Sequence, residues 1–160
     1  MSDKTDLLLA FIVVVAIVFS VLIVPRLLGV QYPLVVVEGR SMLPLLVSGD
    51  LVITTKATNV RIGDIIVYKS CTSPGSFIIH RVVDILRRGQ EVFYVTKGDN
   101  NPYLDNALGE FRTANCILWA PGVPEQRVIG KVLTIRIGST EYVVKIPLLG
   151  SILLELKQLI

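Results

Sequence analysis

The 160-residue chain is poor in the residues that build metal centres, and its charge is not one-sided. It contains a single histidine, His80, which excludes a centre built on several histidines. Its two cysteines, Cys71 and Cys116, lack the paired spacing of a zinc site and can either form one disulfide or remain free thiols. The net charge of +3 is scattered, without a basic stripe, so nucleic acid is not an expected partner.

Polar residues are nearly absent from one stretch close to the N-terminus. Leu7–Val24 reads LLLAFIVVVAIVFSVLIV, in which only Ser20 is polar, and as a helix it would be ~27 Å long, close to the thickness of a bilayer's hydrocarbon core. A buried core helix seldom has so little polarity, and Val24-Pro25-Arg26-Leu27 offers no small-residue cleavage site. We expect a short tail (1–6) and an uncleaved transmembrane anchor (7–25). The flanking charges are nearly balanced, and we favour a cytoplasmic N-terminus.

Helical periodicity is missing between Gln31 and Val144. Short β-branched apolar runs take its place, separated by turn signals such as Ser48-Gly49-Asp50. The runs that predict strands are Leu34–Glu38, Leu51–Thr55, Asp64–Tyr68, Phe77–Leu86, Val92–Thr96, Val128–Ile137 and Glu141–Ile146. They indicate an all-β domain over residues 26–145, of mostly antiparallel strands arranged as a barrel or paired sheets.

Two regions depart from this strand pattern. Gly98–Val123 is long, irregular and rich in Asn, Pro and Gly, and long ordered loops of that kind are often functional. The tail, residues 146–160, is expected to form a short amphipathic helix that lies in the membrane interface or packs on the domain. Its apolar face would carry Leu149, Ile152, Leu153, Leu156 and Ile160.

Candidate chemistry begins at Ser41, which follows an apolar run within Gly39-Arg40-Ser41-Met42-Leu43-Pro44. A serine hydroxyl becomes a useful nucleophile only beside a base that takes its proton. Lys56, Lys69 and His80 are the candidates for that base. Alternation along the strand places His80 in an apolar row, and its ordinary titration range suits a general base.

A histidine base needs an acid to fix its tautomer and to stabilise the imidazolium. Asp99, within Lys97-Gly98-Asp99-Asn100-Asn101, and Asp105, six residues further on, are both candidates. Turn chemistry alone would also explain a Gly-Asp-Asn triplet. The residues by themselves leave the choice between the two acids open.

Four stretches together resemble the type I signal peptidase family, specifically its branch from archaea and the endoplasmic reticulum. The resemblance covers roughly Leu34 to Val132, and the preceding apolar segment agrees with it. In order, the stretches are Gly39–Pro44 followed by Ser48-Gly49-Asp50, then Val60–Ile66, His80-Arg81-Val82 and Lys97–Asn101.

The resemblance implies a membrane-bound serine endopeptidase that removes signal peptides and needs no metal or organic cofactor. Ser41 matches the nucleophile, His80 the base and Asp105 the third member of the site, with Asp99 in a supporting or structural role. Bacterial members carry a hydroxyl residue two positions before the nucleophile, where this chain has Gly39. An oxyanion donor from that side chain is therefore absent, which leaves the Ser41 amide, alone or with a neighbouring group.

The resemblance also implies partners and a location. Signal-peptide-bearing preproteins and the lipid bilayer are the expected partners, and accessory membrane subunits are allowed for. The catalytic domain would lie on the non-cytoplasmic side of a cell or endoplasmic reticulum membrane. The apolar run Val35–Val37 would pair with an extended substrate. Two other functions fit the residues: a Ser-Lys protease related to self-cleaving repressors, and a non-catalytic membrane-tethered domain that binds peptides.

Overall fold

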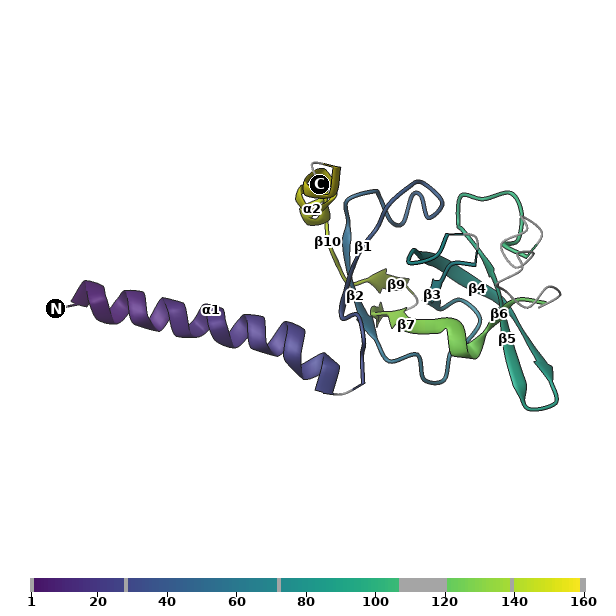
Figure 1. The fold of residues 1–160 in the computed structure, drawn as a ribbon, viewed down its shortest axis with the longest axis horizontal. Helices are drawn as coiled ribbons and strands as arrows, with labels where there is room; N and C mark the ends of the chain where they lie inside the picture. The colour runs from purple at the N-terminus through teal and green to yellow at the C-terminus, as the bar shows by residue number, and fades with distance from the viewer. Residues whose placement is uncertain (1, 28, 72, 107–120, 139, 159–160) are drawn as a thin grey trace.

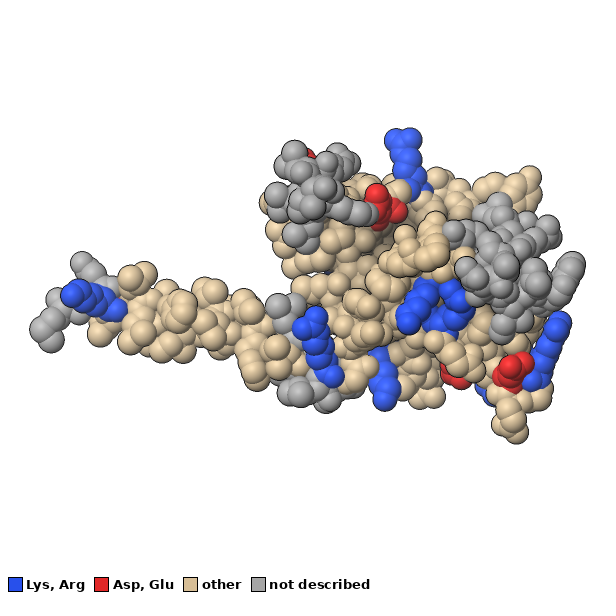
Figure 2. All heavy atoms as spheres, viewed as in Figure 1, with Lys and Arg blue, Asp and Glu red and all other residues tan. Residues whose placement is uncertain are grey.

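A long N-terminal helix projects from a β domain in the computed structural model, which describes residues 2–27, 29–71, 73–106, 121–138 and 140–158 (Figure 1). The helix, α1, covers Ser2–Leu27, and Figure 2 shows no charged atoms over its middle on the face drawn. The side chains of this helix are described without a gap from Lys4 to Ser20. Within the described residues no helix is long and apolar enough to cross a membrane. The transmembrane role of residues 7–25 stays a prediction.

The β domain confirms the expected all-β class. Its pairs are antiparallel, and the main sheet has the order β1-β2-β7-β3-β4-β5-β6, with β10 also paired to β2 and a separate β8–β9 hairpin. Because β1 and β6 stand at the two ends of this order, the described strands do not close into a barrel. The strands are β1 (Leu34–Val36), β2 (Leu51–Thr55), β3 (Ile65–Lys69), β4 (Phe77–Arg88), β5 (Glu91–Lys97), β6 (Val123–Pro124), β7 (Val128–Val132), β8 (Thr134–Ile137), β9 (Thr140–Val143) and β10 (Lys145–Ile146), with a 3-10 turn at Glu125–Arg127.

Strand β3 lies between two apolar cores. Ile66 and Tyr68 point into the first, with Val82, Tyr94 and Val123. Ile65 and Val67 belong to the second, which also holds the buried residues Val37, Met42, Leu46, Val52 and Val132. Successive residues of a strand face opposite sides, so a strand buried on both faces reads as one continuous apolar run. This central strand fixes the position of its neighbour β4, which carries His80.

Two strands predicted as continuous are each divided. The expected strand Val128–Ile137 ends as β7 and resumes as β8, because at Leu133 the chain leaves one sheet for the other. There the Leu133 amide donates to Ile53, and the Leu133 carbonyl accepts from Val144. The second, Glu141–Ile146, divides into β9 and β10 at Val144 for the same reason. Apolar residues run through both junctions, with Val132 next to Leu133 and Val143 next to Val144, so apolarity alone does not mark the change of sheet. Strand β6 begins at Val123, the last residue of the stretch expected to be irregular, and was not predicted.

The C-terminal helix α2 covers Leu149–Gln158 and begins later than the predicted tail, because Ile146 belongs to β10. It lies beside β1, at the end of the domain from which α1 projects (Figure 1). Gly150 allows this approach, since a Cβ there would lie 2.6 Å from Val36 Cγ1. Leu149 and Ile152 are exposed. The side chains of Leu153 and Leu156, and all of Ile160, lie outside the described residues. The predicted boundary between the β domain and the tail, after residue 145, stays a prediction.

An ion pair connects β10 to the loop between β1 and β2, which carries Ser41. The Lys145 ammonium donates to Asp50 Oδ2 at 2.6 Å, and Asp50 is 1% exposed. Burial alone would raise the pKa of the Asp50 carboxyl, but hydrogen bonds from Lys145 and from the Val47 and Leu148 amides outweigh it and hold that pKa below its usual value.

Candidate active site

Ser41 lies in a loop between β1 and β2, and backbone hydrogen bonds join the two ends of this loop. The Val37 amide donates to Asp50 at 2.8 Å, and the Gly49 amide donates to Val37 at 2.9 Å. Gly39 has φ +96°, a left-handed conformation that only glycine adopts without strain. Beyond it Met42 inserts its side chain into the second core. Ser41, half-buried, is therefore presented between a glycine turn and a fixed apolar anchor.

A cavity of about 470 Å³ opens beside this loop and is lined by residues of β1 and of the start of β4. Both Ser41 and His80 line it. In the described part of the chain the Ser41 hydroxyl and the His80 ring share this cavity without a hydrogen bond between them, as is common before a substrate binds. The remaining lining residues are Val35, Val36, Val37, Glu38, Gly39, Met42, Gly75, Ser76, Phe77, Ile78 and Ile79.

His80 is hydrogen-bonded to Asp105. Its Nδ1 lies 2.7 Å from Asp105 Oδ2, and the two residues are 7% and 2% exposed. Asp105 reaches this position from the loop after β5, where its amide donates to the Thr96 carbonyl at 3.0 Å. The structure thus brings together His80 and the acid that the resemblance pairs with it.

Asp105 also accepts hydrogen bonds from two residues that the sequence did not single out. The Tyr68 hydroxyl donates to Oδ2 at 2.7 Å, and the Thr96 hydroxyl donates to the same oxygen at 2.5 Å. Their one sequence signal is a polar atom at an inward-facing position of an apolar strand, which does not say what that atom contacts.

Gly98 lies where the Ser41 loop and His80 meet. A Cβ on Gly98 would be 2.6 Å from the Ser41 carbonyl oxygen and 2.9 Å from His80 Nε2. The next turn adds two bonds to the nucleophile loop: Asn100 donates its amide to the Ser41 carbonyl at 2.8 Å and its side-chain Nδ2 to Arg40 at 3.2 Å. Glycine at residue 98 is therefore required by space, because any larger side chain would push the serine loop from the histidine.

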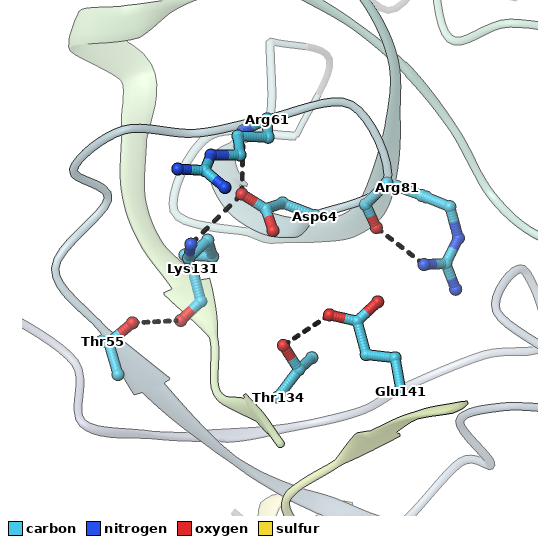
Figure 3. A network of polar contacts seen from close by, with 8 residues as sticks. Thr55, Arg61, Asp64, Arg81, Lys131, Thr134 and Glu141 are labelled. Carbon is cyan, nitrogen blue, oxygen red and sulfur yellow. Dashed lines mark hydrogen bonds and ion pairs between the residues drawn. The ribbon is translucent and has the colours of Figure 1, made fainter. Parts of the chain in front are cut away.

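Asp99 pairs with Arg81 and not with His80. The guanidinium donates Nε to Oδ1 at 2.8 Å and Nη2 to Oδ2 at 2.7 Å. The same guanidinium donates Nη1 to the Gly63 carbonyl, a bond drawn in Figure 3 beside the Asp64–Lys131 pair. The hydrogen bonds that Arg81 donates to Asp99 outweigh burial and raise the pKa of Arg81. Asp99 thus links its loop to the turn before β3.

The two lysines considered as bases lie elsewhere. Lys69 ends β3, is exposed, and lines a different cavity of about 450 Å³ with Tyr32 and Arg127. Lys56 is exposed just after β2 and lies near Gly29. Neither lines the cavity shared by Ser41 and His80.

Cys71 does not line the cavity that Ser41 and His80 share. Cys71 is disulfide-bonded, while Cys116 lies outside the described residues. Within the described ranges no cluster of three or more histidine, cysteine or carboxylate side chains is placed to hold a metal ion.

A serine facing one cavity with a histidine that is bonded to a buried carboxylate is an arrangement typical of serine hydrolases. Comparison with known proteins agrees with this class. The model of the family described as signal peptidase, peptidase S26, matches residues 5–108, and the chain belongs to that family. Signal peptidase I W of Bacillus subtilis (strain 168) is 34% identical over 79 residues, which are 48% of this chain and 40% of the relative. The chain therefore spans less than half the length of the relative it matches.

Proposed function

We propose that this chain is a membrane-bound serine endopeptidase that removes N-terminal signal peptides from exported preproteins. We further place it in the archaeal and endoplasmic reticulum branch of the family, which uses a histidine base. The observation that carries the proposal is the 2.7 Å contact between His80 Nδ1 and the buried Asp105, on a cavity that Ser41 also lines.

In the proposed mechanism Ser41 Oγ attacks the scissile carbonyl while His80 Nε2 takes its proton. Asp105 keeps the other ring proton on Nδ1 and stabilises the imidazolium as it forms. The Ser41 amide stabilises the oxyanion, because Gly39 has no side-chain donor. His80 then gives the proton to the leaving amine, and water hydrolyses the acyl-enzyme by the same steps in reverse order.

The substrate is proposed to bind as an extended strand between β1 and the start of β4. Residues of both segments line the cavity, and β1 ends the main sheet, so among the described strands its outer edge is left to pair with a peptide backbone. Residues one and three positions before the cut would point into the cavity wall, where small side chains fit best. This assignment follows the family resemblance, and the apolar lining supports it.

The position of the lysines argues against the Ser-Lys alternative. A general base must come within hydrogen-bond reach of the hydroxyl that it deprotonates. Lys56 and Lys69 are exposed and outside the Ser41 cavity, whereas His80 lines it. Asp99 is proposed to act structurally, since Arg81 donates hydrogen bonds to both of its carboxylate oxygens.

We also propose that the enzyme works at a bilayer surface, with residues 7–25 as the anchor and the β domain on the non-cytoplasmic side. The apolar run Leu7–Val24 supports the anchor. Exposed Leu149 and Ile152 on α2, at the same end of the domain as α1, support an interfacial position for α2 (Figure 1). Accessory membrane subunits stay a prediction.

One experiment tests the proposal. Purified protein in liposomes is incubated with a preprotein, with Ser41→Ala and His80→Ala beside it, and products are mapped by mass spectrometry. We expect one cut after the signal peptide and losses of ~10³-fold or more in both variants. Near-normal turnover in His80→Ala would favour a lysine base, and no cut by any form would favour a peptide-binding domain.

A second arm of the same assay compares the protein with a form lacking residues 1–25. Preproteins in liposomes should be cut far better by the anchored form, because a shared membrane raises the effective concentration of the two partners. Short soluble peptides should be cut at similar rates by both forms. Equal losses on both substrates would contradict the role at the bilayer surface.

A further inference from the structure

Tyr68 and Thr96 come from the two strands on either side of the strand that carries His80. The sheet order is β3-β4-β5, with Tyr68 opposite Ile78 and Thr96 opposite Val82. Ile78, His80 and Val82 alternate along one face of β4, so their cross-strand partners share that face. The pairing register therefore sets both hydroxyl residues diagonally beside the histidine, one on each side.

Both side chains are buried and both end on the same carboxylate oxygen. Tyr68 is fully buried and Thr96 is 1% exposed. Oδ2 of Asp105 accepts from the Tyr68 hydroxyl, the Thr96 hydroxyl and His80 Nδ1, at 2.7, 2.5 and 2.7 Å. The backbone carbonyl of Thr96 also accepts a hydrogen bond from the Asp105 amide at 3.0 Å. The acid is thus fixed by side chain and backbone together.

A buried carboxylate without donors loses its hydration without replacement, and it is also free to turn about its Cβ–Cγ bond. The neutral imidazole has two tautomers, and the hydrogen bond at one nitrogen decides which nitrogen carries the proton. Whatever holds Oδ2 against Nδ1 consequently leaves Nε2 unprotonated and able to accept a proton.

We propose that Tyr68 and Thr96 are positioning residues of the active site. Their hydroxyls hold Asp105 so that its Oδ2 keeps the His80 proton on Nδ1 and leaves Nε2 free for the Ser41 proton. The inference rests on the proposed function for its catalytic meaning, but its structural content concerns only the state of one ring.

The chain offers matched variants for this inference. Tyr68→Phe and Thr96→Val each remove one hydroxyl and keep the packed volume. Tyr94→Phe is the control, because Tyr94 belongs to the same core but donates to Glu125 at 3.2 Å. Thr96→Ser keeps the hydroxyl while removing the methyl group, so it separates the hydrogen bond from packing.

Because His80 is the only histidine, ¹⁵N labelling of histidine in tag-free, full-length protein in detergent micelles reports this ring alone. At a pH where the ring is neutral, wild type should show mainly the Nδ1–H tautomer. Tyr68→Phe and Thr96→Val should shift the population towards Nε2–H, whereas Tyr94→Phe and Thr96→Ser should match wild type. A wild-type tautomer ratio in both hydroxyl-deleted variants would overturn the inference. This reading needs no peptidase activity, so it stands apart from failure of the proposed function.

The kinetic arm asks whether the hydroxyls act through Asp105. Each deletion should lower kcat by about 10-fold with little change in KM, the size expected for losing one hydrogen bond to a charged group. In an Asp105→Asn background the same deletions should cost less than about 2-fold, since residues acting as a unit are not additive. Equal losses in both backgrounds would mean that Tyr68 and Thr96 support the fold alone.

Discussion

Asp99 and Asp105 stand on one segment after β5, yet the fold gives them opposite surroundings. Asp105 is buried, and its Oδ2 accepts from a histidine, a tyrosine and a threonine. Asp99 is exposed and forms a bidentate ion pair with Arg81, which is one of the residues labelled in Figure 3. Two identical side chains therefore have different capacities: one can stabilise a charge that appears during a reaction, and the other is already neutralised by a permanent cation.

The difference follows from solvation. A buried carboxylate strengthens every nearby electrostatic interaction, because little water screens it, and neutral hydroxyl donors hold it in place without cancelling its charge. A partly exposed ion pair with arginine contributes little to stability beyond its geometry and is weakened by salt. The comparison assigns chemistry to Asp105 and structure to Asp99, and substitutions can test each half.

The largest expected effect is that of Asp105→Asn. The amide has nearly the same shape but cannot hold the proton on His80 Nδ1 as a carboxylate does, so kcat should fall by about 10³-fold or more while the fold persists. Initial rates on a preprotein, together with circular dichroism of the same sample, check this. The reverse result, with Asp105→Asn active and Asp99→Asn folded but inactive, would exchange the two assignments.

Gly98→Ala should come next, because Gly98 connects the two acids' segment to the nucleophile. The added methyl group would lie 2.6 Å from the Ser41 carbonyl oxygen, so the serine loop must move relative to His80. A displacement of about 1 Å from reactive geometry can cost about 10²-fold in rate.

Gly122→Ala is the matched control for Gly98→Ala. Its Cβ would lie 2.5 Å from the Tyr94 carbonyl oxygen, an equally close backbone contact outside the Ser41 cavity. It should lower the unfolding midpoint comparably and keep kcat within about 3-fold, since strain outside the site leaves reactive geometry intact. Similar kcat losses in both variants would show that general loss of packing, and not displacement of Ser41, explains the result.

How far the sequence predicts this site depends on the range of each contact. The alternation of polar and apolar residues next to His80 places it on the inward face of β4, and such a placement can be read from the sequence of any strand. The choice between Asp99 and Asp105 needs burial and partners, which depend on how the loop folds back over β5. The family resemblance, and not the residues themselves, pointed to Asp105.

The contributions of Tyr68 and Thr96 were outside the reach of the sequence. Tyr68 and Asp105 are 37 residues apart, and only the register of three strands brings them together. The division of the predicted strands at Leu133 and Val144 has the same origin. Each is decided by which distant strand supplies a hydrogen-bond partner, while the local sequence stays rich in apolar residues on both sides of the junction.

The smallest expected effect concerns the Arg81–Asp99 pair. Its side chains are 28% and 21% exposed, so a double-mutant cycle of Arg81→Gln and Asp99→Asn should give a coupling of about 1 kcal/mol in the free energy of unfolding. Because the pKa of Arg81 is raised, the contribution on the arginine side is fully present at lower pH and is lost only as pH rises through that raised value, above any pH used for assay. Neutral-range pH should therefore leave the coupling unchanged, whereas 1 M NaCl should reduce it. Arg81→Lys should also lose most of the coupling, since an ammonium cannot reproduce the two parallel bonds.

Urea unfolding of the full-length protein in micelles measures the coupling, and kcat should change by less than about 3-fold across the series. If Asp99→Asn lowered kcat as deeply as Asp105→Asn with its unfolding midpoint unchanged, Asp99 would take part in the chemistry, and the contrast between the two acids would fail.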